Sequence, residues 1–320
     1  IELPISLVYA TAQSWHVFLA THIWGGITER VETPAMSIIS IESIKNEDRV
    51  TGLAINRTMT SAVSIFSPML AAYLITYFGG LENVDSFRPM YIIQFFVGVS
   101  TFILLAMRLE EPKVKRTAAE SGVIDSTLNV FKKLPGLKII LLMNCLNGIF
   151  IGMRSPLIQL YSYEIKKANA YIIGLQGTIS TAVNLTLTFP MASMAERVGR
   201  RRLAYLSQLV YAVCVLSAVL APSPEYLLLY SFLSAFGGAM HIGWDAFLQE
   251  YIPLDMRGRW FGVSSMVNAV ISIPAPILGG LIWNINPDYL WWISFIYYGF
   301  MAVPLMMAVP EMKEETQDEN

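Results

Sequence analysis

The sequence predicts an all-α protein that crosses a membrane many times. Hydrophobic residues make up 54% of the 320 residues and charged residues only 14%, whereas soluble domains carry about 25% charged residues. The charged residues are sparse along almost the whole chain, which excludes a soluble protein with a single membrane anchor. The formal net charge of −2 provides no basic face for nucleic acid.

Apolar runs long enough to cross a bilayer predict nine complete spans. Turn residues or charges separate them: FGGLENVDSFRP, SYEIKKANA, APSPEY and NINPDY lie on one side, and KNEDR, the segment 109–135, ERVGRRR and DMRGR lie on the other. The spans are expected at 15–42, 50–78, 88–108, 136–162, 170–195, 202–221, 224–251, 258–285 and 288–309.

The opening stretch, IELPISLVYATA, is shorter than the roughly 20 apolar residues that a complete span requires. It also lacks the basic start and the small-residue cleavage site of a signal peptide. We therefore expect it to be the end of a helix whose beginning is missing from the sequence.

The distribution of Lys and Arg predicts the orientation, because loops rich in these residues stay in the cytoplasm. Sixteen of the 22 basic residues fall in the loops of one side, and only Arg88, Lys166 and Lys167 fall on the other. The basic side and the C-terminal tail are therefore expected in the cytoplasm, with the protein in the plasma membrane. Aromatic residues near the opposite ends are expected to form an interfacial belt: Trp15, Tyr226, Trp283, Tyr289, Trp291 and Trp292.

The span 15–42 carries three charges at its middle, namely Glu29, Arg30 and Glu32. One charged side chain at the bilayer centre costs about 3 kcal/mol on an insertion scale. This helix therefore cannot face lipid on all sides, and its charges are expected to point into a helix bundle or a watery cavity.

The two cysteines, Cys145 and Cys214, stand singly in apolar runs and are expected to be small apolar packing residues. The sequence contains no disulfide framework and no metal-ligand spacing. We therefore expect no cofactor, no metal and no enzymatic activity.

The chain also resembles itself at a shift of about 210 residues. Gly25-Gly26 matches Gly237-Gly238, Arg49-Val-Thr-Gly52 matches Arg259-Trp-Phe-Gly262, and Ser67-Pro68-Met-Leu matches Ala275-Pro276-Ile-Leu. Parallel repeats about an axis along the membrane normal are one architecture of secondary transporters. The alternative is a chance similarity between apolar helices that share Gly and Pro.

The loop from Ala192 to Arg202, ASMAERVGRRR, resembles the G-x-L-a-D-R-x-G-R-R signature of the major facilitator superfamily. Ala192, Met194 and Glu196 stand where the pattern has Gly, Leu and Asp. In the family this loop follows the second helix of each half, so the resemblance makes 170–195 the eighth helix of twelve and 15–42 the fourth. The exporter-type motif of the fifth helix is degraded to Ser67-Pro68-Met-Leu-Ala71-Ala72, which leaves import and export both open.

The resemblance implies a two-bundle fold that runs from the end of the third helix to the twelfth. We expect an incomplete N-terminal helical bundle at 1–108 and a cytoplasmic central linker at 109–135. A C-terminal six-helix bundle is expected at 136–310, followed by an acidic cytoplasmic tail at 311–320. The first two helices and most of the third have no counterpart in the sequence.

Polar residues recur at helical spacing on the spans that line the central cavity in the family. On the fourth helix, for example, His22, Gly25, Glu29, Glu32 and Met36 share one stripe. The expected substrate or proton pathway consists of His22, Glu29, Arg30, Glu32, Arg57, Asn144, Asn147, Arg154, Gln176, Asn184, His241 and Asp245.

Two interpretations of these residues remain open. In one, Glu29, Glu32 and Asp245 titrate and couple proton movement to transport, while the arginines hold a polar or charged substrate. In the other, the charges form static ion pairs that fasten the bundles, the histidines satisfy hydrogen bonds, and the Asn and Gln side chains hold helices together.

A second group of residues is expected at a cytoplasmic gate. It comprises Glu196, Arg197, Gly199, Arg200, Glu250, Arg257 and Arg259. Glu196 is expected within ion-pair reach of Arg257 or Arg259, and Arg200 is expected to approach Glu250. The alternative is that these arginines only anchor the loops on the cytoplasmic side.

The sequence is thus interpreted as a secondary transporter that moves a small polar or charged solute by alternating access, coupled to protons. Its expected partners are the solute, protons and the lipid bilayer, without nucleic acid, and the protein is expected to be a monomer. A multidrug-type exporter of the same family is an alternative, and a non-transporting membrane receptor or scaffold is an alternative from another class.

Overall fold

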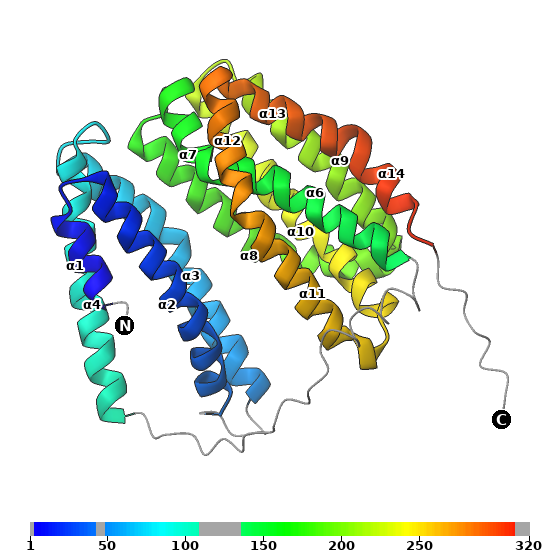
Figure 1. Ribbon diagram of the computed structural model, residues 1–320, viewed down its shortest axis with the longest axis horizontal. Coiled ribbons are helices and arrows are strands. Elements are labelled where there is room, and N and C mark those ends of the chain that lie inside the picture. The colour runs from blue at the N-terminus through cyan, green and yellow to red at the C-terminus, as the bar shows by residue number, and fades with distance from the viewer. Residues whose placement is uncertain (1–2, 43–48, 109–135, 311–320) are drawn as a thin grey trace. The chain divides into compact units, whose positions relative to one another are not determined.

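The computed structural model describes residues 3–42, 49–108 and 136–310, and among these it leaves open the side chains of a few helical residues, Arg30, Arg57 and Glu42 included. Every regular element in the described ranges is a helix (Figure 1). The predicted all-α membrane fold is therefore confirmed. Eight helices or runs of helices in these ranges are long and apolar enough to span a bilayer, and they correspond to eight of the nine predicted spans. The ninth, predicted at 15–42, has the length of a span but is not among these eight.

Each predicted span corresponds to a helix or an interrupted helix. In the N-terminal part, α1 (Leu3–Thr11) is followed by α2 (Trp15–Glu42), α3 (Arg49–Tyr77), the 3₁₀ turn η1 (Val84–Phe87) and α4 (Arg88–Arg108). The next span consists of α6 (Gly136–Arg154), η2 (Ser155–Leu157), α7 (Ile158–Leu160) and η3 (Tyr161–Ile165). The remaining elements are α8 (Ala170–Val198), α9 (Arg200–Val219), η4 (Pro224–Tyr226), α10 (Leu227–Tyr251), α11 (Leu254–Ser272), α12 (Pro274–Ile285), α13 (Pro287–Ile296), η5 (Tyr297–Met301) and α14 (Ala302–Met307).

Prolines interrupt two spans that the sequence presented as continuous. The span predicted at 258–285 is divided into α11 and α12, and Pro274 opens the second helix. The span predicted at 136–162 changes to the 3₁₀ turn η2 directly after Arg154, where Pro156 stands near the start of the turn. Proline lacks an N–H donor and clashes with the preceding turn, so it breaks a helix that hydropathy alone treats as uniform.

The chain divides into two compact units, which we describe separately. Unit 1 comprises residues 1–118 and 169–174, and unit 2 comprises residues 119–168 and 175–320. In unit 1, α1 packs against α4 and α2, and α2 also contacts α3. In unit 2, α9 packs along α10 and α13, while α6 packs against α11 and α12.

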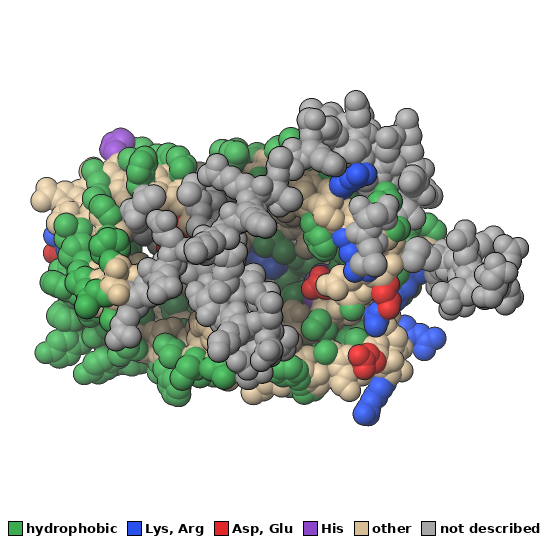
Figure 2. Space-filling view, turned by 90° about the horizontal axis from the view of Figure 1, so that it is seen from below, with side chains coloured by type: hydrophobic (Ala, Val, Ile, Leu, Met, Phe, Trp, Pro, Cys, Tyr) green, Lys and Arg blue, Asp and Glu red, His purple; other side chains and the backbone are tan. Residues whose placement is uncertain are grey.

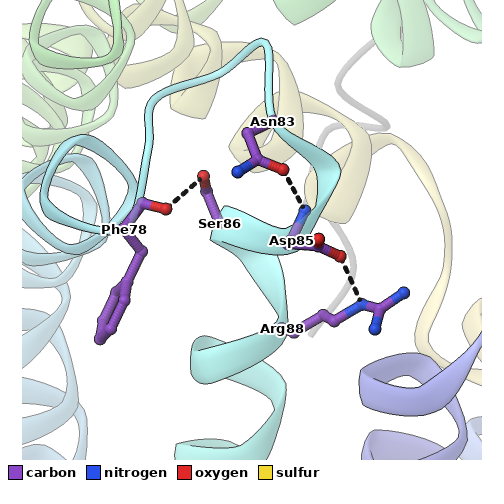
Figure 3. A network of polar contacts seen from close by, with 5 residues as sticks. All are labelled: Phe78, Asn83, Asp85, Ser86 and Arg88. Atoms are coloured by element: carbon purple, nitrogen blue, oxygen red, sulfur yellow. Dashed lines mark hydrogen bonds and ion pairs between the residues drawn. The ribbon is translucent and has the colours of Figure 1, made fainter.

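The turn between α3 and α4 is fixed by side chains that satisfy its backbone (Figure 3). The Ser86 hydroxyl donates to the carbonyl of Phe78 at 3.0 Å, and the Asp85 amide donates to Asn83 Oδ1 at 3.0 Å. Arg88 Nε forms an ion pair with Asp85 at 3.0 Å. Asn83 thus acts as the N-cap of η1 and sets the direction in which α4 leaves the turn.

The outer faces of the helices are apolar. Large hydrophobic side chains such as Phe66, Phe96, Phe189 and Ile285 are more than half exposed. In Figure 2, hydrophobic side chains cover most of the described surface that faces the viewer, and most of the charged side chains gather toward one side. A surface of this kind is suited to lipid contact, since large exposed apolar patches are rare on soluble monomers.

Gly279 allows α12 to approach α6 closely. A Cβ added at Gly279 would lie 2.2 Å from the carbonyl oxygen of Met153, which is backbone and cannot move cheaply. The adjacent Gly280 has no atom within 4 Å of an added Cβ. The two glycines therefore form a matched pair that differs only in the helix contact.

We expect Gly279→Ala to destabilise the protein by about 1–3 kcal/mol, the usual cost of overpacking. Gly280→Ala is expected to be neutral or to stabilise by up to about 1 kcal/mol, because Ala favours a helix more than Gly does. Thermal unfolding of the purified proteins in detergent measures both effects. Equal melting temperatures for the two variants would contradict the close approach of α12 and α6.

Candidate functional site

The polar stripe of α2 lies open in the structure. His22, Glu29 and Glu32 are exposed, whereas Thr28 between them is buried and donates to the Gly25 carbonyl at 2.9 Å. Among the side chains that the structure describes, Glu29 and Glu32 take part in no ion pair. Two carboxylates therefore stand uncovered at the middle of a helix with the length of a membrane span.

Part of the predicted pathway lies outside the described side chains. This applies to Arg30 of α2 and Arg57 of α3. Further along α3, Thr60 donates to the Asn56 side chain at 3.3 Å, and Ser64 donates to the Thr60 carbonyl at 2.8 Å. Both bonds lie within α3, so they do not connect it to another helix.

The predicted stripe of α6 and its extension is present, and its contacts are made with α13 and η5. Tyr298 donates to the Asn147 side chain at 3.3 Å. Tyr161 donates to Asp288 at 2.6 Å. The Arg154 guanidinium lies 5.3 Å from the Trp291 ring centroid and 5.8 Å from that of Tyr298. Asn144 on the same stripe is partly buried.

Arg154 is the most enclosed charge that the structure describes in unit 2. Its exposure is 8%, and the residues around it are aromatic or apolar. Its Nε and Nη1 atoms are buried without a hydrogen-bond partner, and so is Nε1 of the contacting Trp291. No Asp or Glu among the described residues forms an ion pair with Arg154. A buried charge without a partner costs several kcal/mol, so this arrangement requires an explanation.

On α8, the predicted Gln176 and the nearby Ser180 connect helices. Gln176 is buried and donates to the Leu227 carbonyl of α10 at 3.4 Å, and Ser180 donates to the Ser231 carbonyl at 3.4 Å. These contacts match the interpretation that such side chains hold helices together. Asn184, one turn further along, is exposed and donates to the Ser180 carbonyl within its own helix at 3.0 Å.

On α10, His241 and Asp245 lie one turn apart with different surroundings. His241 is partly buried, its Nδ1 has no hydrogen-bond partner, and its ring lies 6.4 Å from that of Tyr211. Asp245 is exposed and forms no ion pair with any described residue. Asp245 therefore resembles Glu29 and Glu32, as an open carboxylate within a helix of membrane-spanning length.

One of the two ion pairs predicted for the cytoplasmic gate is present. Arg200 at the start of α9 forms an ion pair with Glu250 near the end of α10, as expected. Arg257 instead donates to the carbonyls of Gln249 and Ile252, the latter at 3.0 Å, and so caps the end of α10. Glu196 forms no ion pair with Arg257 or Arg259 in the described part of the chain, so the predicted Glu196 contact is absent from this structure.

The connection between α8 and α9 depends on one glycine. Gly199 has φ of +102°, a conformation that favours glycine. Arg197 near the end of α8 is exposed, and so is Arg259 in α11. Arg201 bonds to the Val309 carbonyl and lies 4.8 Å from the Phe247 ring, a contact that connects α9 to the end of α14 and that the sequence analysis missed.

A network at the opposite end of unit 2 was also missed. Lys166 donates to the carbonyls of Val219 and Ala221 at 2.7 and 3.2 Å, and it lies 5.6 Å from the Tyr161 ring. Burial lowers the pKa of the Lys166 ammonium, and the Asp288 carboxylate opposes that shift. The basic residue therefore fastens the end of α9, rather than only marking the side of the membrane.

The aromatic neighbours of Arg154 were the main omission. Trp291 was assigned to the interfacial belt, but its exposure is 2%, so that assignment is wrong. Tyr211, Tyr230 and Tyr298 were not singled out at all. The signal that could have found them is a Tyr within an apolar span, because the hydroxyl of a buried Tyr usually finds a polar partner. By contrast, Trp15, Tyr226, Tyr289 and Trp292 are exposed, as a belt requires.

A polytopic helical protein with open intramembrane carboxylates and a buried arginine has the features of a membrane transporter. The model of the Major Facilitator Superfamily matches residues 3–165 and 140–320. The chain therefore belongs to the major facilitator superfamily, a transporter family, and is not an enzyme. The predicted two-bundle family fold is confirmed.

Curated relatives are distant. An uncharacterized MFS-type transporter of Methanocaldococcus jannaschii is 22% identical over 265 residues, which are 79% of this chain and 61% of that protein. Hexose transporter 1 of Plasmodium falciparum is 22% identical over 242 residues, 63% of this chain and 46% of that protein. The chain thus spans less than two thirds of the length of these relatives.

Solved structures share the fold at low identity. A bacterial metal transporter superposes with a TM-score of 0.71 at 16% identity, covering 95% of this chain and 80% of that chain. A bacterial homologue of the iron transporter ferroportin, in an inward-facing state, gives 0.70 at 16% identity, covering 95% and 78%. These similarities establish the fold alone.

The Arg200–Glu250 pair can be tested by reversing its charges. Arg200→Glu and Glu250→Arg each place like charges together, so we expect each to lower stability by about 1 kcal/mol or less, since both side chains are partly exposed. The double variant restores opposite charges and is expected to recover most of the loss. Thermal unfolding in detergent measures the stability of the wild type, the two single variants and the double variant. Arg202→Glu serves as the control. Additive losses in the double variant would mean that the two side chains do not interact.

Proposed function

We propose that the protein is a secondary transporter that moves a small polar or charged solute by alternating access, coupled to protons. One observation carries this proposal: Glu29, Glu32 and Asp245 are exposed although they lie within helices of membrane-spanning length. Family membership supports the general class, and these carboxylates support the mechanism.

The cost of exposed charge in a bilayer supports an aqueous pathway. Each carboxylate that faced acyl chains would cost about 3 kcal/mol, and nothing within its own unit covers it among the described residues. Charged residues within membrane spans face the bundle interior or a water-filled cavity instead. The faces of α2 and α10 that carry these residues are therefore the proposed walls of the pathway, together with exposed His22 and Asn184.

Proton coupling follows from the same side chains. Carboxylates and histidines are the groups that relay protons in pumps and transporters. A protonated carboxyl group is neutral, so burying it in a closed conformation without water costs less free energy. Protonation of Glu29, Glu32 or Asp245 would therefore favour one conformation of the transporter over the other, and a gradient of pH could drive the cycle.

In the cycle we propose, the Arg200–Glu250 pair belongs to the cytoplasmic gate with Glu196, Arg197, Gly199, Arg257 and Arg259. A partly exposed pair contributes only about 1 kcal/mol. That energy still changes the populations of two conformations about fivefold. The gate pair would therefore adjust the balance between conformations without locking either.

The proposed orientation places the end with Arg197 to Arg202 in the cytoplasm and the α3–α4 turn outside. This assignment rests on the excess of Lys and Arg in one set of loops. It puts the C-terminal tail in the cytoplasm. We further propose that the plasma membrane is the site of action and that the monomer is the working unit.

Labelling of single cysteines tests the orientation. In a background without Cys145 and Cys214, Arg202→Cys should react with an impermeant maleimide only after the cells are opened. Glu82→Cys, in the exposed α3–α4 turn, should react in intact cells. The parental chain without introduced cysteine is the control. Reaction of both positions from the same side would contradict the proposed topology.

The carboxylates are tested in proteoliposomes with the full-length protein. A thermal-shift screen with sugars, amino acids, organic anions and drugs first identifies a solute. We expect Glu29→Gln, Glu32→Gln or Asp245→Asn to abolish accumulation driven by a pH gradient while leaving solute exchange at equal pH, because exchange needs no net proton movement.

The matched control is Glu82→Gln, which removes an exposed carboxylate outside the spans. It should leave both activities unchanged. Unchanged accumulation in the triple variant would exclude the proton role. Solute binding without any uptake or exchange would instead favour the receptor alternative, and net efflux against a gradient would favour the exporter alternative.

A further inference from the structure

Arg154 sits in a cage formed by side chains from several helices of unit 2. The Arg154 guanidinium lies 5.3 Å from the ring centroid of Trp291 in α13 and 5.8 Å from that of Tyr298 in η5. Tyr230 of α10 packs edge-on against Trp291 with ring centroids 5.5 Å apart. Tyr211 of α9 lies 5.3 Å from the Tyr298 ring. We call this set, Arg154, Tyr211, Tyr230, Trp291 and Tyr298, the arginine cage.

The cage holds hydrogen-bond donors that lack acceptors. Arg154 Nε and Nη1 and Trp291 Nε1 are all buried without a partner. Arginine and the indole N–H can only donate, so they cannot satisfy one another. The Tyr298 hydroxyl interacts with the guanidinium, but Nε and Nη1 stay unpaired. Two other nearby acceptors already carry bonds, since the Asn147 oxygen accepts from Tyr298 and the Tyr230 carbonyl accepts from Cys214 at 3.3 Å.

The cage also holds an uncompensated positive charge. None of the described carboxylates of unit 2 forms an ion pair with Arg154: Asp288 accepts from Tyr161, Glu250 pairs with Arg200, Glu225 accepts from Ser223, and Glu164, Glu196 and Asp245 are exposed. Ring faces attract a buried cation by about 2 kcal/mol or more, but they do not accept the in-plane N–H groups. A small anion would satisfy both the charge and the unpaired donors.

The helices are irregular at the cage. α6 ends at Arg154 and continues as the 3₁₀ turn η2, and Tyr298 belongs to the π-helical turn η5. Such interruptions are frequent at functional sites, and broken helices form many transporter binding sites. The η5 turn carries Tyr298, whose ring centroid lies 5.8 Å from the Arg154 guanidinium, and the η2 turn begins directly after Arg154. The two interruptions at one place are a second geometric feature that points to a ligand.

We propose that the arginine cage binds one small anion, the carboxylate group of a monocarboxylate solute. The guanidinium matches a carboxylate with two parallel N–H donors, and Trp291 supplies a further donor. The aromatic rings suit a compact apolar or aromatic body next to the carboxylate. This proposal deepens the transport function above, since it names the class of solute, and it rests on that function only for the solute being transported.

Binding is tested on the purified full-length protein in detergent, in a HEPES buffer that contains neither chloride nor any carboxylate. Acetate, propionate and benzoate are the probes, and benzamide is the neutral control with the shape of benzoate. We expect at least one carboxylate to raise the melting temperature by a few degrees at saturating concentration, because ligand binding to the folded state stabilises it. Benzamide is expected to have no effect.

Arg154→Met separates the cage from other sites. Without the probe, this variant should melt at the same temperature as the wild type or higher, since it removes a buried unpaired charge. Its response to the carboxylate should be lost. The control Arg202→Gln, an exposed arginine outside the cage, should respond like the wild type. If Arg154→Met does not fold, Trp291→Phe keeps the ring and the arginine, and it should weaken the apparent affinity several-fold.

Three results would overturn the proposal. The first is no stabilisation of the wild type by any of the carboxylates. The second is an equal response in Arg154→Met, or in Trp291→Phe where that variant replaces it. The third is saturable stabilisation by chloride alone, which would make the cage an inorganic anion site. Carboxylate binding that depends on Arg154 without uptake in proteoliposomes would leave the site intact and contradict only the transport function.

Discussion

The free-energy cost of placing charge in a hydrocarbon environment governs the arrangement of this protein. Many helices present large apolar side chains at their surface, as at Phe66 and Phe189. Charges within spans are handled in two ways. Glu29, Glu32 and Asp245 lie open on helix faces, which a bilayer permits only if water reaches them. Arg154 is enclosed among aromatic side chains within unit 2.

The same constraint explains how the helices are held together. In a membrane the hydrophobic effect does not drive helix association, so close packing and polar contacts have to. Gly279 supplies a close approach of α12 to α6, and Gln176 and Ser180 of α8 donate to backbone carbonyls of α10. At the helix ends, Arg257 and Lys166 bond to carbonyls that have no partner within their helices. Polar side chains in this protein thus serve structure in some places, whereas the open carboxylates make no ion pair among the described residues.

The sequence could predict the helices well because their signals are local. The span expected at 50–78 is α3 (Arg49–Tyr77), and the span expected at 170–195 is α8 (Ala170–Val198). The helix breaks at Pro156 and Pro274 were not predicted, because a hydropathy average over many residues does not register a single proline. The stripe of Asn147, Arg154 and Tyr161 was also predictable, since helical periodicity defines one face. Its partners on α13 and η5 were not, because periodicity does not say which helix a face meets. Trp291 shows the same limit: its sequence position suits an interfacial belt, and only the fold reveals that it is buried against Arg154.

The separation of the two kinds of charge has a consequence for energetics. Moving one elementary charge across a membrane changes the free energy by about 2.3 kcal/mol per 100 mV. If the open carboxylates of α2 and α10 carry a proton while the arginine cage carries a carboxylate solute, the two transported charges cancel. Movement of one proton with one monocarboxylate would then be electrically neutral, and the pH gradient alone would drive it. Arg154 itself stays in place, so its charge contributes nothing to this balance. A carrier of this kind gains its driving force from the chemistry of the open carboxylates and its solute selectivity from the enclosed arginine, which is why the two can lie on different elements of the fold.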